Sequence, residues 1–432
     1  MESWLDIPAQ SDFSLINIPF GVITHANAGA SGRRVAVAIG DKALDLAVFS
    51  ASQGFSYLPA IQPYLHVFHE PTLNAFASLG RPIHRLVREY LQKVFLKNGP
   101  YRELLQDNRE LRSVSLIKLT SVQNYLPMHI GDYTDFYVGK HHAYNVGVLF
   151  RGPATALQPN YAHLPVGYHG RASSIVVSGT SVRRPWGQIL DADNAPIYHP
   201  SKRLDIELEL GAFLCKGNPL GTPVSLAEAE DFLFGYVLLN DWSARDIQAW
   251  EYVPLGPFIA KNFASTVSAW VVLADALEPF RTEGIPNEVE CLSYLKSDVN
   301  KAMFDINLEI SLHPNGTASE AVISHSNSRN MLWSFPQMLT HHTVGGCPMN
   351  AGDLIGSGTI SGPKSGTEGS LLELTNGGTK PFQASGVERR FLEDGDEVVL
   401  RGWCIDSNGH RLGFGECKGQ ILSAWVQGVT LE

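Results

Sequence analysis

The sequence is poor in cysteine, and its five thiols do not stand in the spacings that build disulfide frameworks or zinc sites. Their number is odd and they lie far apart, without a CxxC pair or a Cys/His cluster. We therefore expect reduced thiols, as in a cytoplasmic protein. The five are Cys215, Cys291, Cys347, Cys404 and Cys417.

The sequence also has no apolar run of transmembrane length, and residues Met1 to Asp6 lack the basic start and apolar core of a secretory signal. A formal net charge of -10 leaves no excess of lysine and arginine to neutralise phosphates. These absences argue against export, a membrane anchor and a nucleic-acid partner. An anionic substrate must be held by a few locally placed cations.

Common nucleotide-binding and hydrolase motifs are missing as well, because no Walker, Rossmann, HExxH or GxSxG pattern occurs. The segment from Gly413 to Gly419 imitates a nucleotide-binding loop, but the residues around it favour strands and no helix follows. The chemistry of this chain must therefore rest on other residues.

The overall composition is that of an ordinary globular protein. Its 432 residues are 44% hydrophobic and 18% charged, which is enough for a buried core and two domains of unequal size. The 40 glycines and 25 prolines predict many turns between short strands. A polar stretch before residue 120 suggests a small domain over 1–120 and a larger one over 121–432.

Local patterns predict the main elements. A tight turn at Gly40 and Asp41 separates two short strands, and apolar residues recur at helical spacing from Arg81 to Asn98. After residue 120, short apolar runs broken by glycine and proline favour strands, and we expect few helices. The expected strands there are 174–177, 234–239, 268–273 and 394–400, and the expected helices are 227–232 and 328–342, the latter weakened by Pro336.

The stretch from Ile130 to Gly147 concentrates carboxylates, tyrosines and the pair His141-His142 between glycines, without the apolar period of a core helix. Such a composition is typical of a functional site, although a solvated turn has the same appearance. Later segments help to decide between the two.

Residues 204–210 alternate apolar and acidic, so in a strand Asp205, Glu207 and Glu209 would share one face. Carboxylates that are close together in a pocket need a cation or raised pKa values, and oxygen ligands favour Ca²⁺ or Mg²⁺ over Zn²⁺. Taken alone, the segment is more typical of the solvated face of a strand.

The apolar run that follows ends in Asn-Asp-Trp-Ser, which places Asp241 at a strand end and puts Arg245 and Gln248 on one helix face. These residues offer a hard metal ligand and two hydrogen-bond donors. The alternative is a helix cap with an Asp241–Arg245 pair.

Two further charged residues stand in apolar surroundings. Lys261 is either held inside by a function or extends to solvent, and Glu373, in an expected strand, is either an edge residue or a carboxylate with a tuned pKa. Between them, the glycine-rich segment from Gly352 to Gly362 suggests close backbone approach or a set of ordinary turns.

Together these segments resemble the fumarylacetoacetate hydrolase family over nearly the whole chain. The most specific pieces are Gly-Asp-Tyr-Thr-Asp-Phe-Tyr at 131–137, Leu-Pro-Val-Gly-Tyr-His-Gly-Arg at 164–171, Asn-Asp-Trp-Ser-Ala-Arg-Asp at 240–246 and Gly-Thr-Ile-Ser-Gly at 358–362. The fold that the resemblance implies is mainly β with some α. It has a small N-terminal β-barrel-like domain and a larger C-terminal mixed β-roll domain of the fumarylacetoacetase type, in a homodimer.

The resemblance also implies residue roles. It makes His142 the base, oriented by Glu373, and gives Arg245, Gln248 and Lys261 the stabilisation of an oxyanion. The implied ligands of Ca²⁺ and/or Mg²⁺ are Asp135, Glu207, Glu209 and Asp241, with Lys261 and Ser265 near a second cation position. The implied substrate-binding residues are Tyr137, Arg151, Tyr168, Arg245, Gln248 and Thr359.

The implied reaction is the metal-dependent hydrolysis of a carbon–carbon bond in 4-fumarylacetoacetate, a small diketo-acid, to fumarate and acetoacetate. In the family this is the last step of tyrosine and phenylalanine catabolism. The sequence departs from the usual pattern at Tyr144, Ala260, Ala264 and Ser265, which leaves a related diketo-acid open as substrate. The alternatives are an oxo-acid decarboxylase or isomerase on the same scaffold and a metal-binding protein without catalysis.

Overall fold

The computed structural model describes residues 2–25, 32–297 and 299–426. It begins with a sheet that contains the predicted hairpin: β2 pairs with β3 so that Ile39 lies opposite Lys42 around Gly40, which has a φ of +58°. The strands of this first lobe are β1 (Phe20–His25), β2 (Arg34–Ile39), β3 (Lys42–Asp45), β4 (Leu116–Lys118) and β5 (Val122–Tyr125).

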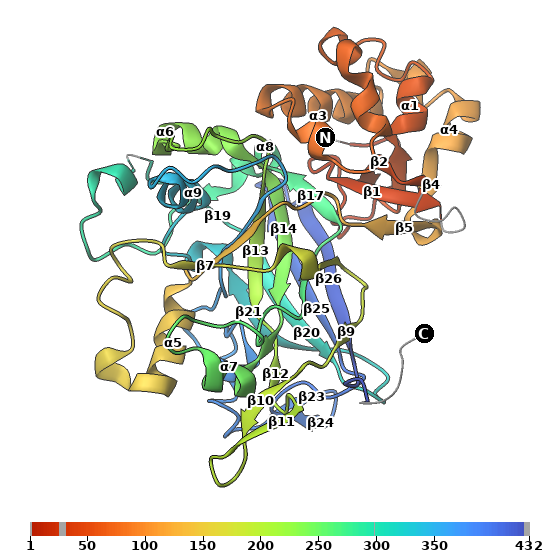
Figure 1. Cartoon of the computed structure of the whole chain (residues 1–432). Helices are drawn as coiled ribbons and strands as arrows, with labels where there is room; N and C mark the ends of the chain where they lie inside the picture. Colours follow the sequence, from red (N-terminus) through yellow and green to blue (C-terminus); the bar gives the residue numbers. More distant parts are fainter. Residues whose placement is uncertain (1, 26–31, 298, 427–432) are drawn as a thin grey trace.

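Helices cover this sheet, and the lobe that they form is red to orange in Figure 1. The longest is α3, where Val87, Leu91 and Val94 face the core at helical spacing and Pro82 stands in the first turn, as predicted. The helices are α1 (Leu46–Ala51), α2 (Asn74–Ala77), α3 (Arg81–Phe95) and α4 (Arg109–Ser115), with 3-10 turns η2 (Pro59–His69), η3 (Arg102–Leu104) and η4 (Leu119–Ser121).

The larger part of the chain is rich in strands. They are β6 (Tyr133–Phe136), β7 (Gly167–His169), β8 (Ile175–Val177), β9 (Val182–Arg183), β10 (Trp186–Leu190), β11 (Pro196–Pro200), β12 (Leu204–Asp205), β13 (Leu208–Leu214), β14 (Leu233–Asp241), β15 (Ser243–Ala244), β16 (Ser265–Val267), β17 (Trp270–Leu273), β18 (Arg281–Thr282), β19 (Met303–Phe304), β20 (Asn307–His313), β21 (Ala321–Asn327), β22 (Leu354–Gly356), β23 (Phe382–Ala384), β24 (Val387–Arg389), β25 (Glu397–Ile405) and β26 (Arg411–Leu422).

Short helices connect these strands. They are α5 (Lys140–Arg151), α6 (Leu226–Ala229), α7 (Arg245–Glu251), α8 (Ala274–Leu277), α9 (Phe335–Thr343) and α10 (Leu371–Leu374), with 3-10 turns η5 (Pro153–Thr155), η6 (Ala172–Ser174), η7 (Glu230–Phe232), η8 (Glu278–Phe280), η9 (Ser293–Leu295) and η10 (Ser328–Asn330). The expected small first domain and larger, sheet-rich second domain are confirmed.

One sheet runs through both parts of the molecule (Figure 1). Its main path is β4-β3-β2-β1-β17-β14-β13-β22-β6-β7, and β1 joins β17 with Phe20 opposite Val271. A second sheet, β21-β20-β25-β26-β9, packs against it through β25 and β26. Because β13, β14, β22 and β6 are neighbours, residues far apart in sequence meet near the middle of the first sheet.

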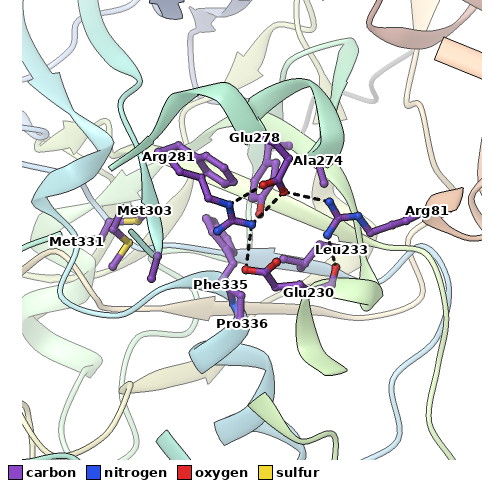
Figure 2. A pocket seen from close by; sticks show the side chains of 13 residues that line it. Arg81, Glu230, Leu233, Ala274, Glu278, Arg281, Met303, Met331, Phe335 and Pro336 are labelled. Carbon is purple, nitrogen blue, oxygen red and sulfur yellow. Dashed lines mark hydrogen bonds and ion pairs between the residues drawn. The ribbon is translucent and has the colours of Figure 1, made fainter. Parts of the chain in front are cut away.

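Ion pairs also hold the two parts together. Figure 2 shows Arg81 of α3 between Glu278 and the backbone carbonyl of Glu230, and Arg281 between Glu278 and the Glu230 carboxylate. The hollow that these side chains line has a volume of only about 10 Å³. That is room for about one water molecule, so it is a packed junction and not a substrate site.

Several local predictions are wrong. The segment 204–210 is not one strand, because Ile206 and Glu207 interrupt it between β12 and β13. Helix α5 forms from the second half of the site-like stretch, where no helix was expected. Glu373 lies in helix α10 and not in a strand.

Two expected helices are shorter or divided. The helix predicted for 328–342 is a 3-10 turn followed by α9, which starts at Phe335 with Pro336 in its first turn and with a capping box from Ser334. The helix predicted for 227–232 is shared between α6 and η7. In the first case residues 331–334 separate the two helical segments, and in the second case η7 follows α6 directly.

Candidate active site

Four carboxylates meet in the interior where the strands of the first sheet converge. Asp135 comes from β6, Glu209 from β13, Asp241 from the end of β14, and Glu207 from the break before β13. One oxygen atom of each lies within 4.8 Å of the others, and all four residues are buried. Glu207, in the break, and Glu209, in β13, thus belong to the same cluster, as their predicted common face suggested, whereas Asp205 does not.

A glycine makes room for this cluster. In the parallel pair β22–β6, Gly356 lies opposite Asp135, and a Cβ atom on Gly356 would stand 2.6 Å from Asp135 Oδ1. Gly358 has a φ of +74° and donates its N–H to Glu209 Oε2 at 3.0 Å. The glycine-rich segment thus approaches the acidic residues closely, which was one of its two predicted explanations.

The cluster carries more negative charge than its surroundings neutralise. Burial raises the pKa values of Asp135 and Glu209 well above their usual range, and repulsion from Asp241 and Glu207 adds to both shifts. Glu207 differs, because Lys261 and Arg245 outweigh the effect of burial and hold its pKa below the usual range.

These residues fit a divalent cation. Asp135 Oδ1 and Glu209 Oε1 are buried and have no hydrogen-bond partner, a costly arrangement unless a cation occupies the space between the carboxylates. The donor set consists of carboxylate oxygens only, which is typical of hard ions. The cluster could therefore hold a divalent metal ion.

Two buried cations border the acidic cluster. Lys261 Nζ lies 2.6 Å from Glu207 Oε2 and 2.8 Å from Asp241 Oδ2, so the side chain points inward and does not extend to solvent. Arg245 Nη2 lies 2.8 Å from Glu207 Oε1. Neighbouring carboxylates keep the pKa of Lys261 above its usual value although burial alone would lower it.

Arg245 does not form the Asp241 pair that was the alternative explanation of its spacing. Its Nε donates to Asp205 Oδ2 at 2.7 Å and its Nη1 donates to Gln248 Oε1 at 2.9 Å. The second bond confirms that Arg245 and Gln248 share a helix face, and it leaves the Gln248 amide nitrogen as the donor of that side chain.

A histidine–carboxylate pair stands beside the cluster. His142 Nδ1 lies 2.6 Å from Glu373 Oε2, and His142 Nε2 lies 3.9 Å from Glu207 Oε1. Burial opposes the ionisation of Glu373, but His142 and hydrogen bonds from Asn145 and Ser370 lower its pKa below the usual value. Glu373 is therefore an anion that fixes the tautomer of His142, with Nε2 as the acceptor.

Asn145, Ser361 and Ser370 complete this arrangement, although no sequence pattern predicted a role for them. Asn145 Nδ2 donates to Glu373 Oε1 at 2.9 Å, and the two serine hydroxyls donate to Oε2 at 2.9 and 2.8 Å. Asn145 follows His142 by three residues, so recognition of α5 as a helix would have placed both on one face.

These groups open onto a pocket of about 450 Å³. The predicted site residues that line it are Asp135, Tyr137, His142, Arg151, Tyr168, Glu207, Arg245, Gln248 and Lys261. Tyr168 donates its hydroxyl to Asp241 Oδ2 at 3.0 Å, and Ser265 donates to Asp241 Oδ1 at 2.8 Å. Thus one pocket contains Asp135 and Glu207 of the acidic cluster, the two cations and the histidine, while Glu209, Asp241, Ser265, Thr359 and Glu373 are not among its lining residues.

Two of the predicted substrate-binding residues keep a hydrogen-bonding group that no other described residue uses. Arg151, at the end of α5, donates to the carbonyls of Thr155 and Ala156 at 3.1 and 2.6 Å, which leaves Nη1 for a ligand. Thr359 is buried, and its hydroxyl has no partner. Of the residues that depart from the family pattern, Tyr144 is 44% exposed and Ala260 and Ala264 are buried.

Comparison with known proteins agrees with this architecture. The family model for the fumarylacetoacetase N-terminal domain matches residues 16–127, and the model for the fumarylacetoacetate (FAA) hydrolase C-terminal domain matches residues 133–422. A solved structure of a fumarylacetoacetate hydrolase from Exiguobacterium antarcticum has a TM-score of 0.52 at 17% identity, covering 94% of this chain and 99% of that chain. At that identity the likeness concerns the fold.

Curated relatives are much closer in sequence. The chain is 60% identical over 430 residues to a fumarylacetoacetase of Aspergillus fumigatus, covering 98% of this chain and 99% of the relative. It is 46% identical over 424 residues to the fumarylacetoacetase of Homo sapiens, covering 98% and 99%. With both domain models matched and full-length relatives at this identity, the chain belongs to the fumarylacetoacetate hydrolase family.

Proposed function

We propose that this protein hydrolyses the carbon–carbon bond of the β-diketone 4-fumarylacetoacetate and releases fumarate and acetoacetate. The single observation that carries the proposal is the His142–Glu373 pair, which faces the four-carboxylate cluster across one pocket. Fumarylacetoacetases from several kingdoms align over 98% of the chain and support the choice of substrate.

In the proposed reaction, His142 removes a proton from water. Its Nδ1–H is held by Glu373, so Nε2 accepts the proton and the carboxylate stabilises the imidazolium that forms. His142 Nε2 and Glu207 Oε1 are 3.9 Å apart, too far for a direct hydrogen bond, so one water molecule can reach both. The resulting hydroxide attacks the carbonyl carbon next to the fumaryl double bond.

The cationic side of the pocket stabilises the negative charge that develops on the carbonyl oxygen. Arg245, Lys261 and the amide nitrogen of Gln248 are already held in place by their buried partners, so they stabilise the charge without reorganising. Collapse of the tetrahedral intermediate breaks the carbon–carbon bond, and the methylene carbon leaves as an enolate that takes up a proton. Tyr137, Arg151, Tyr168 and Thr359 bind the carboxylates and carbonyls of the substrate.

We propose Ca²⁺ or Mg²⁺ as the ion of the acidic cluster, because the donors are carboxylates and no sulfur or imidazole belongs to the set. When bound, such an ion acts as a Lewis acid that lowers the cost of negative charge on the diketone oxygens. Asp135, Glu207, Glu209 and Asp241 would hold it. Lys261 and Ser265 are proposed to border a second cation position.

The test is product identification after incubation of purified protein with 4-fumarylacetoacetate. The proposal requires fumarate and acetoacetate in equal amounts, loss of activity on chelation, and better recovery with Ca²⁺ or Mg²⁺ than with Zn²⁺. Release of carbon dioxide or an isomerised diketo-acid without fumarate would assign a different reaction to the pocket.

We also infer a homodimer in the cytoplasm. Val253, Leu255 and Phe258 are 67%, 96% and 70% exposed beside the pocket, which is unusual for apolar side chains unless a second copy covers them. All five cysteines are free thiols, as expected in a reducing compartment. Light scattering and cell fractionation test these two inferences.

In the described residues, none of the helices has the length and apolar character to span a membrane.

A further inference from the structure

Asp205 is the acidic residue of the 204–210 segment that does not join the metal cluster. It is fully buried in β12, and the break at Ile206 and Glu207 separates it from the other carboxylates. A carboxylate removed from water needs strong partners, because an unpaired buried charge is very costly. The proposed mechanism gives this buried charge no role.

Four donors surround Asp205. Oδ1 accepts the N–H groups of Ile206 and Leu371, both at 2.7 Å. Oδ2 accepts the N–H of Leu372 at 2.9 Å and Nε of Arg245 at 2.7 Å. An asparagine of the same shape has a single acceptor oxygen, so it cannot satisfy all four donors.

These contacts reach both halves of the catalytic pocket. Leu371 and Leu372 open α10, the short helix that carries Glu373, and Glu373 orients His142. Arg245 opens α7 and directs its guanidinium to Glu207 and Gln248. One carboxylate therefore fixes the helix behind the base and the guanidinium that faces the developing negative charge.

We propose that Asp205 is a positioning residue that couples the His142–Glu373 pair to Arg245. It touches neither substrate nor the acidic cluster. It sets the distance between the group that removes the proton and the group that receives the negative charge. The catalytic part of this inference rests on the proposed hydrolysis.

Asp205→Asn tests the coupling, with Asp396→Asn as the matched control. Asp396 is also fully buried and also accepts four hydrogen bonds. Two come from Arg389, Nε at 2.9 Å and Nη2 at 3.0 Å, and two come from the backbone N–H groups of Asn315 at 2.8 Å and Glu393 at 2.9 Å. It lies outside the pocket. Both substitutions remove the same kind of buried charge.

The expected result is a selective loss of turnover. Asp205→Asn lowers kcat by about ten- to a hundredfold with little change in KM, because displacement of catalytic groups by a fraction of an ångström acts on the transition state. Asp396→Asn lowers the melting temperature but leaves the kcat of the folded protein unchanged. Equal kcat for both variants and the wild type would overturn the proposal.

A second readout does not depend on turnover. The hydrogen bond from His142 Nδ1–H to Glu373 Oε2 is short, so its proton should give a downfield resonance in the proton NMR spectrum. This resonance shifts or broadens in Asp205→Asn and is unchanged in Asp396→Asn. If the wild type does not cleave fumarylacetoacetate, the proposed function fails, while the resonance still decides whether Asp205 positions the pair.

If Asp205→Asn does not fold, the same link is tested from its other end. Arg245→Lys keeps the charge but loses the Nε bond to Asp205, so the His142 resonance is expected to shift. Lys261→Arg is the control, because Lys261 also contacts Glu207 but not Asp205. A resonance that is unchanged in Arg245→Lys, or shifted equally in both variants, would contradict the proposal.

Discussion

At the scale of single residues, the central feature is the pair His142 and Glu373. Their hydrogen bond of 2.6 Å assigns the imidazole tautomer, and Asn145, Ser361 and Ser370 fix the carboxylate from its other sides. Because the imidazole of His142 is already held in its reactive orientation, no free energy is needed to orient it during the reaction. Removal of either member should therefore damage the same step.

We predict that His142→Ala lowers kcat by at least about a hundredfold and that Glu373→Gln also slows turnover. Because the two residues act as one unit, the double variant should be little worse than the worse single variant. Steady-state kinetics with metal-loaded protein measures this. Multiplied losses in the double variant would show that the residues act independently.

At the scale of elements, the strand patterns predicted the scaffold well and the helices near the pocket poorly. The buried run of β14 and the hairpin β2–β3 follow from apolar content and a two-residue turn. Helix α5 was missed because its buried residues, His142, Ala143 and Gly147, include no large apolar side chain that would reveal the helical period. A helix that lines a polar pocket has too few large apolar residues to show a helical period in the sequence.

The candidate site was likewise predicted only in part from the sequence. The ligand types were evident from the clustered carboxylates, but alternation alone grouped Asp205 with Glu207 and Glu209. The break after β12 depends on contacts with α10 and α7, which lie at least 40 residues away in sequence. Such long-range hydrogen bonds cannot be read from a local pattern. The division of the chain at residue 120 stays a prediction, and β5 at 122–125 pairs with β1.

The loop after α7 yields a prediction about Lys261. The Glu251 carboxylate accepts the N–H groups of Phe258, Ile259 and Ala260 at 2.7, 3.1 and 2.8 Å, so it ties the end of α7 to the segment that carries Lys261. Glu251→Ala should lower kcat by about tenfold through displacement of the lysine. Glu251→Gln, which keeps one acceptor oxygen, should lose less.

The matched control for this experiment is Glu228→Ala. Glu228 also accepts a backbone N–H, that of Ser225, but it caps α6 and lines no part of the pocket in the described structure. Its kcat should equal that of the wild type. If Glu251→Ala also keeps the wild-type kcat, the loop does not need this anchor.

His84 gives a prediction for the contact between α3 and the central sheet. It is 1% exposed, its ring packs at a tilt against Phe76 and edge-to-face against Phe234, and its Nε2 lies 2.8 Å from the Ala77 carbonyl. Burial lowers its pKa from 6.5 to about 4. Between those pH values the unfolded chain binds a proton that the folded protein does not, so the free energy of unfolding falls as the pH decreases from 6.5 to about 4.

The loss attributable to His84 is about 3.5 kcal/mol at most, from 1.4 kcal/mol per pKa unit. Denaturant unfolding at several pH values should show a shallower decline for His84→Gln than for the wild type. His325→Gln, at a side chain that is 64% exposed, should follow the wild-type curve. Parallel curves for the wild type and His84→Gln would contradict the assignment.

At the scale of the whole molecule, the acidic cluster links ligand binding to stability. Its carboxylates come from β6, β13, β14 and the break before β13, so relief of their repulsion strengthens the centre of the sheet that runs through both domains. A cation at about a hundredfold excess over its Kd adds roughly 3 kcal/mol to the free energy of unfolding. The melting temperature of chelated protein should rise on addition of Ca²⁺ or Mg²⁺.

Glu209→Gln is the variant that checks this prediction. Glu209 Oε1 has no hydrogen-bond partner, so the amide removes repulsion in the metal-free state and a ligand in the metal-bound state. The variant should melt higher than chelated wild type and gain less from added ions. An equal gain in both proteins would place the ion elsewhere.

The measurement that tests the central claim most directly is hydrolysis of 4-fumarylacetoacetate in water enriched in oxygen-18, with mass analysis of the fumarate. If water activated by His142 attacks the carbonyl carbon next to the fumaryl double bond, the new carboxylate of fumarate carries one labelled oxygen, and His142→Ala produces this species far more slowly. Fumarate without the label, or a product other than fumarate and acetoacetate, would contradict the account.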